Sequence, residues 1–369
     1  MNFQERLADI CQRMRDEQLD LLIGLHDGAH FIETPNPVMV MSGFKSLGAA
    51  AVLLRAEGSS EMVVTPAWDA ERAAKCCPET HIFGGVDVVE TLLKLIDGRS
   101  LVSIGLAGLR FLPSEIAYRV TAAFPQARPA DAIVFDAARI KTGVEIANAR
   151  EATRIAERGY QHLLHIARPG ISEDELAATL KWHMKTLGAE DNFLMLCAGP
   201  HNRAVQPSTG RRLQAGDIIL AEITPSYRGQ LAQICRTVVI GPVSNELARN
   251  YALVVHAMDQ GIAAAVSGVA MSEVCRAINA VLEAEGYGEY CHSPHIRRRG
   301  HGLGFASVRP GDVALDNATV LEPDMVFMVH PNQYLPQTGY LLCGEPVVMT
   351  AQGAEPFTEQ KAALASVPS

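Results

Sequence analysis

Apolar and polar positions in the first third of the chain alternate between two periods, one typical of helices and one of short buried strands. Leu7, Ile10, Cys11 and Met14 share one helical face. The pattern then predicts strands at 20–25, 49–54, 62–65, 100–106 and 132–136, and helices at 68–76, 86–96 and 113–124. Helices that alternate with short buried strands are typical of an α/β domain, which we place at 1–136.

A pattern of glycines and apolar positions repeats in the rest of the chain, after a polar connection at 136–145. Gly170 and Gly268 each precede an amphipathic helix that ends at a further glycine, with a spacing of 18 residues in both copies (170 to 188 and 268 to 286). Two unrelated helices that end in glycine are the ordinary alternative. A duplicated α+β half-domain fits this distance better than a solenoid, so we expect a second domain at 144–360 with a pocket between its halves.

Composition limits the class of protein. The chain has 369 residues, of which 48% are hydrophobic and 20% charged, as in ordinary globular proteins with two domains. A net charge of −9 disfavours a nucleic-acid partner bound through phosphates. Since the longest apolar runs fall short of the roughly 18 residues that a membrane helix needs, no membrane partner is expected.

The cysteines and the first residues bear on the compartment. Eight cysteines are spread along the chain without a disulfide framework, and charges are scattered through the first 20 residues without an apolar signal region. These features favour reduced thiols in a cytoplasmic protein.

A first candidate for chemistry is the segment 216–241, which predicts two strands joined by a turn at 227–229. Glu222 interrupts the apolar run of the first strand, and Gln233 lies on the returning strand. A carboxylate buried in such a strand needs a partner or a function. An edge-strand glutamate that faces water is the alternative.

Two histidines form the second and third candidates. In RRRGHGLGF at 297–305, glycines on both sides of His301 allow the backbone to approach a cleft closely. His330 ends a predicted strand within 321–349, at its exit into a loop, where functional side chains tend to lie. A core or surface histidine is the alternative for His301.

Basic residues surround the first histidine. The neighbouring arginines form a positive field that could receive a substrate carboxylate, or else a solvated turn or subunit contact; they are Arg297, Arg298, Arg299 and Arg309. Other histidine and cysteine groups, at 162–165 and 291–295, lack a complete ligand set. Dinucleotide, P-loop and nucleophile-elbow motifs are absent from the sequence.

Several segments resemble, in order and spacing, the pita-bread family of creatinase, prolidase, aminopeptidase P and methionine aminopeptidase. They are GDIILAEI with GQLAQICRT (216–237), RGHGLG (299–304), VLEPDMVFMVHP (320–331), GEPVVM (344–349), RIKTGVEIANAREATRIA (139–156) and PVMVMSGF (37–44). The resemblance implies an α+β pita-bread catalytic domain with a smaller creatinase-type α/β domain before it. It also accounts for the duplication.

The metallopeptidases of this family hold two divalent metals with two Asp, one His and two Glu. Carried over by position, the Asp residues fall on Glu222 and Gln233, and the His falls on His301. The first Glu falls on His330, and the last falls on or near Gly344, with Glu345 beside it. Because an amide or a hydrogen cannot supply the charge of a bridging carboxylate, the resemblance implies a member without the dinuclear ligands.

Two catalytic options follow. Creatinase cleaves a small guanidino acid without metal, using a histidine as acid and base. That histidine's place in the segment after 198–200 is taken here by Val205, Gln206 and Pro207, while His201 lies nearby. A metal-free pocket would use His301, His330 and Glu222 as catalytic groups. Alternatively, these three could hold one Fe, Zn or Mn as a 2-His-1-carboxylate set.

We therefore expect a metal-independent, creatinase-like hydrolase of a C–N bond in a small polar, carboxylate-bearing substrate. Expected substrate contacts are Gln233, Gln206, His201, Arg299, Glu345 and Phe44. A mononuclear-metal hydrolase or lyase and a non-catalytic binding protein are the alternatives. Creatinase-type relatives are homodimers whose N-terminal domain reaches the partner's pocket, so residues of 26–45 such as His30, Phe44 and Lys45 are expected to shape the neighbouring site.

Overall fold

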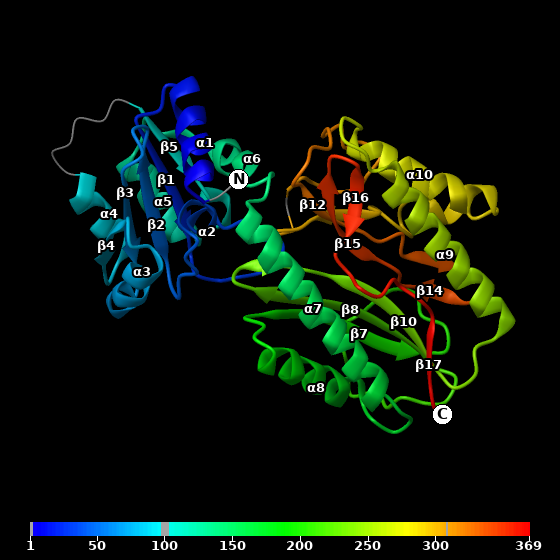
Figure 1. The fold of residues 1–369 in the computed structure, drawn as a ribbon. Helices are drawn as coiled ribbons and strands as arrows, with labels where there is room; N and C mark the ends of the chain where they lie inside the picture. Colours follow the sequence, from blue (N-terminus) through cyan, green and yellow to red (C-terminus); the bar gives the residue numbers. More distant parts are fainter. Residues whose placement is uncertain (1–2, 97–102, 308) are drawn as a thin grey trace. The chain divides into compact units, whose positions relative to one another are not determined.

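A six-stranded mixed sheet forms the centre of the first unit, residues 1–143 with 305–307 (Figure 1). The computed structural model describes residues 3–96, 103–307 and 309–369. In the order β4-β3-β2-β1-β5-β6, the strands are His81–Gly84, Ser60–Val64, Ala50–Arg55, Leu21–His26, Ile104–Ala107 and Arg128–Pro129. The helices are α1 Phe3–Asp16, α2 Pro37–Ser42, α3 Ala70–Cys76, α4 Val88–Ile96, α5 Ser114–Ala123 and α6 Asp131–Ala137, with short 3₁₀ turns η1 Ala67–Asp69 and η2 Leu109–Phe111.

Side chains of β1 alternate between two apolar clusters, because successive residues of a strand point to opposite faces. Leu21, Ile23 and Leu25 pack with residues of α4 and α5. Leu22 packs instead with residues of α1, α2 and α6. Helices therefore cover both faces of the sheet, which confirms the predicted α/β organisation of this part of the chain.

One predicted strand is wrong. The run at 132–136 belongs to helix α6, which buries Ile133, Val134 and Ala137 and packs against α1 and α2. A short apolar run does not distinguish a strand from one buried turn of helix, and here the tertiary contacts decide. The strand expected at 100–106 is observed as β5 from Ile104, and residues 100–102 lie outside the described residues.

The second unit, 144–304 with 308–369, contains two larger sheets and the helices that cover them (Figure 1). Its first half contains α7 Gly143–Ile166, α8 Glu173–Thr186, β7 Asn192–Gly199, β8 Ile218–Tyr227, β9 Gln230–Leu231 and β10 Ile234–Ile240. Its second half contains α9 Asn245–Ala264, α10 Met271–Ala284, η3 Gly288–Cys291, β11 Gly300–Gly302, β12 Val326–Val329, β13 Gln333–Leu335, β14 Gly339–Leu341, β15 Glu345–Thr350, β16 Gly353–Pro356 and β17 Ala365–Val367. One sheet has the order β17-β10-β8-β7, with β9 beside β8, and the other has the order β11-β12-β15-β16.

The predicted repeat is present in the second unit. In each half a long helix is followed by a 14-residue helix, α8 or α10. Gly170 donates its N–H to Leu213, and Gly268 donates its N–H to Leu321, at the same place in each half. Both glycines have φ near +90° (89° and 88°), a conformation that favours glycine. A capping box of Ser172 and Glu175 begins α8.

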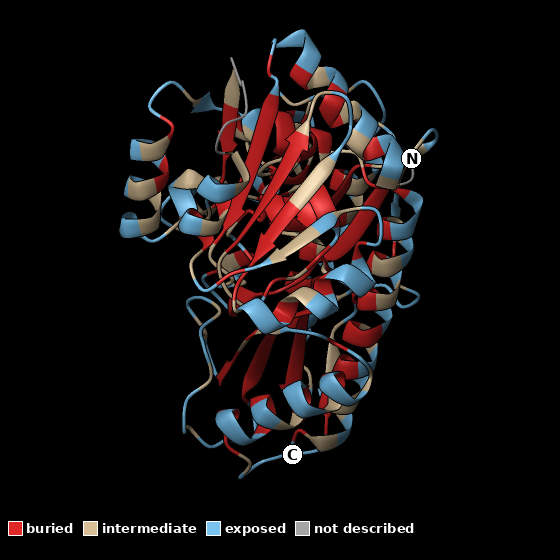
Figure 2. Cartoon of the chain, turned by 90° about the vertical axis from the view of Figure 1, so that its left-hand side faces the viewer, coloured by how far each residue is buried: buried red, intermediate tan, exposed pale blue. Residues whose placement is uncertain are grey.

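Buried and exposed residues are distributed in the same way in both units. In Figure 2 the strands are largely buried and the outward faces of the helices are exposed. Among the described residues, no helix combines the length and apolar character needed to cross a bilayer.

Candidate active site

Strand register brings Glu222 and Gln233 to one face of the first sheet of the second unit. Cys235 on β10 lies opposite Glu222 on β8, and Ile234 lies opposite Ile223. Continuing this antiparallel register places Gln233 opposite Thr224. Because alternate residues share a face, the side chains of Glu222, Thr224 and Gln233 are neighbours.

A hydrogen-bonded chain of side chains crosses from this sheet to the other. The Gln233 Nε2 donates to Glu222 Oε1 at 2.5 Å and lies 3.1 Å from Thr224 Oγ1. The Gln233 Oε1 lies 3.0 Å from His301 Nε2, and the other ring nitrogen of His301 lies 3.0 Å from the carbonyl oxygen of Gly302. Gln233 and His301 are both buried, whereas Glu222 is partly exposed.

His330 lies on the same face as His301, because His301 on β11 is opposite Met328 on β12 and His330 follows two residues later. The two imidazole rings are 5.2 Å apart, centroid to centroid, and meet edge to face. Burial lowers the pKa of His330 well below its usual value, and the charges of His301 and Arg298 act in the same direction. His330 Nδ1 makes no hydrogen bond to the described residues. His330 is therefore a neutral imidazole with an unused ring nitrogen.

Gly344 faces His330 across the second sheet. The register of β12 with β15 pairs Val329 with Glu345 and so continues to His330 and Gly344. A Cβ at Gly344 would lie 2.6 Å from His330 Cβ and 2.6 Å from the end of Met328. The side chain of His330 therefore occupies the space that a side chain at position 344 would need.

Backbone hydrogen bonds join the two sheets beside the site. Cys235 and Gly344 exchange two N–H to carbonyl hydrogen bonds, each 3.2 Å long. This bridge ties the strand that follows Gln233 to Gly344, which lies opposite His330. The sheets thereby hold Glu222, Gln233, His301 and His330 together, as the sequence predicted for this group.

Glu345 lies on the opposite face of β15 from Gly344, because a shift of one residue along a strand reverses the face. Its carboxylate is 3.1 Å from Arg236 Nη2 and accepts the N–H of Ala362. Burial raises the pKa of Glu345, and Arg236 opposes this effect. This placement gives Glu345 a structural contact with Arg236, and its expected substrate contact stays a prediction.

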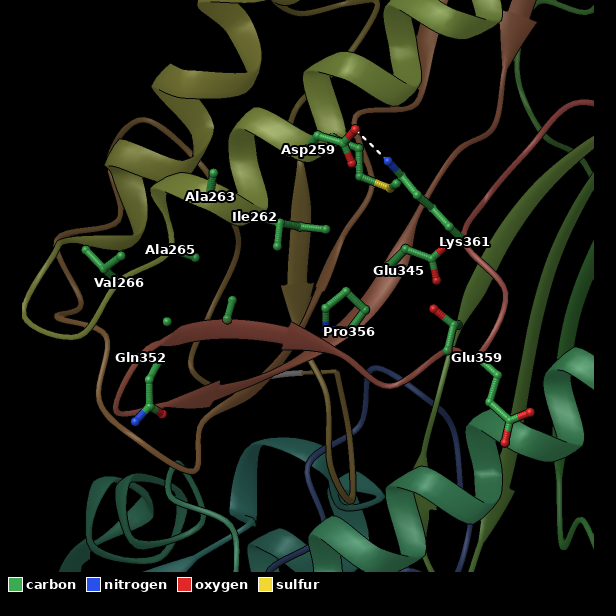
Figure 3. A pocket seen from close by; sticks show the side chains of 14 residues that line it. Asp259, Ile262, Ala263, Ala265, Val266, Glu345, Gln352, Pro356, Glu359 and Lys361 are labelled. Carbon is green, nitrogen blue, oxygen red and sulfur yellow. Dashed lines mark hydrogen bonds and ion pairs between the residues drawn. The ribbon is translucent and has the colours of Figure 1, made fainter.

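The outer side of Glu345 borders a separate cavity of about 480 Å³ between α9, β16 and the segment 356–361 (Figure 3). Asp259 and Lys361 form an ion pair of 2.6 Å on its wall. The histidine pair does not line this cavity, among the residues that the structure describes.

Three further predicted substrate contacts lie elsewhere. His201 and Gln206 line a cavity of about 300 Å³ that also contains Glu173, and His201 Nε2 contacts the carbonyl oxygen of Pro336. Phe44 is buried in the core of the first unit beneath the guanidinium of Arg72. Among the described residues, His301 lines neither this cavity nor the core around Phe44. The substrate contacts of His201, Gln206 and Phe44 stay predictions.

Arg299 is held by neutral polar groups, and, in addition to burial, its charge contributes to the lowered pKa of His330. Its guanidinium donates to Asn279 Oδ1 at 2.7 Å and to Gln333 Oε1 at 2.9 Å, and it also bonds the carbonyl oxygen of Pro331. Its backbone contacts the site, where its carbonyl oxygen accepts the N–H of His330. Its side chain thus packs towards α10, and its expected substrate contact stays a prediction.

Sequence reasoning missed Thr224 and the role of Gly344. Thr224 lies two residues after Glu222, a spacing that places both on one face and could have revealed it. The packing of Gly344 against His330 depends on the pairing of β12 with β15, which has no local sequence signal.

The donor atoms of the cluster decide what it can hold. It offers one carboxylate, two imidazoles and one amide, and the amide of Gln233 directs its N–H at the carboxylate of Glu222. A pair of divalent cations is usually bridged by carboxylate oxygens, and in this cluster Glu222 supplies such oxygens. Among the described residues, no group of three or more His, Cys, Asp or Glu side chains is arranged to hold a metal ion.

Comparison with known proteins finds similar chains. Uncharacterized peptidase YqhT of Bacillus subtilis (strain 168) is 30% identical over 223 residues, which cover 59% of this chain and 62% of that protein. The Xaa-Pro dipeptidase of Pyrococcus furiosus is 24% identical over 365 residues, 98% of this chain and 99% of that one. The chain thus spans less than two thirds of the first relative and nearly all of the second.

Solved structures confirm the expected pita-bread fold with its smaller N-terminal part. The prolidase from Pyrococcus horikoshii OT3 superposes with a TM-score of 0.84 at 22% identity, covering 97% of this chain and 99% of that one. The Xaa-Pro dipeptidase from Bacillus anthracis gives 0.84 at 23% identity, covering 99% and 100%. The model of metallopeptidase family M24 matches residues 147–351, more than half of the chain. The chain therefore belongs to metallopeptidase family M24.

Proposed function

We propose that this protein is a metal-independent hydrolase that cleaves a C–N bond in a small polar substrate, with His330 as general base and His301 as general acid. The observation that carries the proposal is the hydrogen-bonded chain Glu222–Gln233–His301, against which the neutral ring of His330 is packed.

The hydrogen-bond directions assign protons to the two histidines. Because the amide nitrogen of Gln233 faces the Glu222 carboxylate, its oxygen faces His301 and calls for an N–H at Nε2. The Nδ1 of His301 also faces an oxygen, that of Gly302, and so also suits an N–H. His301 is then a proton donor, while burial keeps His330 unprotonated. A hydrogen-bond-donating imidazole beside an unprotonated one can serve as an acid and base pair.

The proposed reaction uses one water. Water adds to the carbon of the C–N bond while His330 accepts a proton from it, and His301 donates a proton to the nitrogen as the bond breaks. The products are the acid and the amine. Glu222 holds Gln233 in the orientation that supports the protonated ring of His301. The proton on His330 returns to His301 through solvent.

The substrate class rests on the relatives and on the donor set. Relatives named Xaa-Pro dipeptidase and prolidase cleave a bond between carbon and nitrogen, which supports C–N hydrolysis here. The presence of Gln233, His330 and Gly344 where the family's dinuclear enzymes carry carboxylates supports a mechanism without two metals. A creatinase-like small polar substrate with a carboxylate is the finer proposal.

Assays of purified protein against Xaa-Pro dipeptides, small amides, ureas and guanidino acids test the proposal. We expect turnover of one class to fall about 100- to 10,000-fold in His301→Ala and in His330→Ala, the usual contribution of a general acid or base. His165→Ala, an exposed histidine of α7, is the matched control and should keep full activity. Full activity in both site variants would contradict the proposal.

Metal content separates the mechanisms. We expect elemental analysis of protein purified without added metal to show no stoichiometric ion, and activity to survive chelation. One Fe, Zn or Mn per chain, lost together with activity on chelation, would favour the mononuclear alternative that uses Glu222, His301 and His330. Absence of any turnover together with tight binding of a macromolecule would favour a binding protein.

A further inference from the structure

A third, smaller cavity of about 220 Å³ lies in the second unit, between α10, the segment 291–299 and the segment 314–316. At roughly 30 Å³ for each liquid water, it has room for about seven waters, or for one compact ion with a small organic group. The residues that line it include Asn279, Cys291 and His292, together with the arginines at 297, 298 and 299. Neither His301 nor His330 lines it, within the described part of the chain.

Arg299 is the unusual member of this cavity. Its side chain is 1% exposed, and it pairs with no carboxylate among the described residues, since its acceptors are the neutral oxygens of Asn279, Gln333 and the 331–332 backbone. Its Nη2 makes no standard hydrogen bond, and the thiol of Cys291 lies beside it. A buried cation without an anionic partner is costly, so an anion supplied from outside would satisfy it.

The rim of the cavity carries the same sign of charge. Arg298 is 3.0 Å from Asp312, and Arg297 lies 3.8 Å from the same carboxylate, so one acid is shared by two guanidinium groups. Asp316 lines the cavity and offsets part of the charge, while His292 adds a further donor. Three guanidinium groups line this hollow, whereas Asp316 is the acid among the described residues that line it.

We propose that this cavity binds a phosphoryl-type oxyanion, held by Arg299 at its base and by Arg297 and Arg298 at its rim. Several converging guanidinium N–H groups suit a compact multivalent oxyanion better than a singly charged carboxylate. The site is independent of the proposed hydrolysis, because it uses neither the imidazoles nor Glu222.

Calorimetric titration with inorganic phosphate at constant ionic strength tests the site. We expect saturable binding with one phosphate per chain and a rise in Tm, while chloride at equal ionic strength gives neither. Acetate distinguishes a carboxylate preference, and tighter binding of acetate than of phosphate would overturn the assignment. Absence of saturable binding of phosphate would also overturn it.

Variants locate the anion. Arg297→Gln and Arg298→Gln, on the rim, should each weaken phosphate binding about tenfold, the effect of losing one charge-assisted contact of about 1.4 kcal/mol. Arg276→Gln, which removes an exposed arginine of α10 outside the cavity, is the matched control and should bind as the parent does. Equal affinity in all three variants would overturn the proposal, even if Arg299→Gln fails to fold.

Discussion

Single residues control how the two sheets of the second unit meet. Gly344 is opposite His330 and exchanges backbone hydrogen bonds with Cys235, so a side chain at 344 would need the space that His330 occupies. The φ angle of Gly344 is not positive, so its backbone is not in the left-handed region. Space, rather than conformation, therefore explains glycine at this position.

We expect Gly344→Ala to lower the free energy of unfolding by about 1–3 kcal/mol, the usual cost of an added methyl group in a packed core. Urea unfolding of the purified variant measures this cost. Gly210→Ala, where an added Cβ meets nothing within 4 Å, should change stability by less than about 0.5 kcal/mol.

A double-mutant cycle with His330→Gly identifies the cause. The double variant should be less destabilised than the sum of the two single variants, since removing the Cβ of His330 makes room for the Cβ at 344. Strict additivity would show that the strain of Gly344→Ala does not arise at His330.

At the scale of elements, the end of strand β1 carries a further buried histidine. His26 is 2% exposed, its Nδ1 accepts the N–H of Gly28 at 3.0 Å, and its Nε2 has no hydrogen-bond partner among the described residues. Burial, reinforced by the nearby His30, lowers the pKa of His26 from 6.5 to about 4. The turn after β1 is thus built around an unprotonated imidazole.

This turn predicts a loss of stability in mild acid. Between pH 6.5 and about 4 the unfolded chain binds a proton at His26 and the folded chain does not, so stability falls as the pH falls through this range. The total loss is about 3 kcal/mol, at up to roughly 1.4 kcal/mol for each pH unit. Urea unfolding at pH 7 and pH 5 measures it.

His26→Gln should flatten this dependence on pH, because the amide does not titrate. His81→Gln, at an exposed histidine of β4, is the control and should leave the dependence as in the parent. An equal slope in the His26 variant and the parent would show that other groups cause the acid sensitivity.

At the scale of the whole molecule, exposed apolar side chains on the first unit are relevant to the expected dimer. Phe31, Leu47 and Trp68 are 53%, 56% and 72% exposed, and Leu47 lies beside Asp69, the neighbour of Trp68. Large apolar side chains gathered on a surface often mark an interface. Phe31 lies within the region 26–45 that the family resemblance places near the partner's pocket, and Leu47 lies two residues after it.

We expect light scattering to give a mass of about twice 39.8 kDa at micromolar concentration. Trp68→Ser should shift the protein towards monomer, because it removes the most exposed of these three side chains. Trp182→Ser, at a tryptophan of α8 that is 66% exposed, is the matched control and should leave the mass unchanged. A monomeric parent at every concentration would contradict the dimer.

Sequence by itself determined the features that depend on local pattern. The helix and strand periods and the glycines at 170, 188, 268 and 286 were sufficient to predict the α/β part and the duplicated part, because each depends on neighbouring residues. The motifs around Glu222, His301 and His330 were sufficient to predict that these side chains gather. The apolar run at 132–136 was not sufficient to predict a helix, since that helix depends on packing against α1 and α2.

Tertiary structure alone decided which atoms meet. Gln233 hydrogen-bonds both Glu222, on its own sheet, and His301, on the other sheet. The two sheets must therefore pack so that Gln233 Oε1 and His301 Nε2 are 3.0 Å apart. The face to which Glu345 points depends on the register of β15, because a shift of one residue would reverse it. The burial of Arg299 depends on its contacts with α10 and with residues 331–333. These contacts join residues far apart in sequence, so no local pattern could specify them.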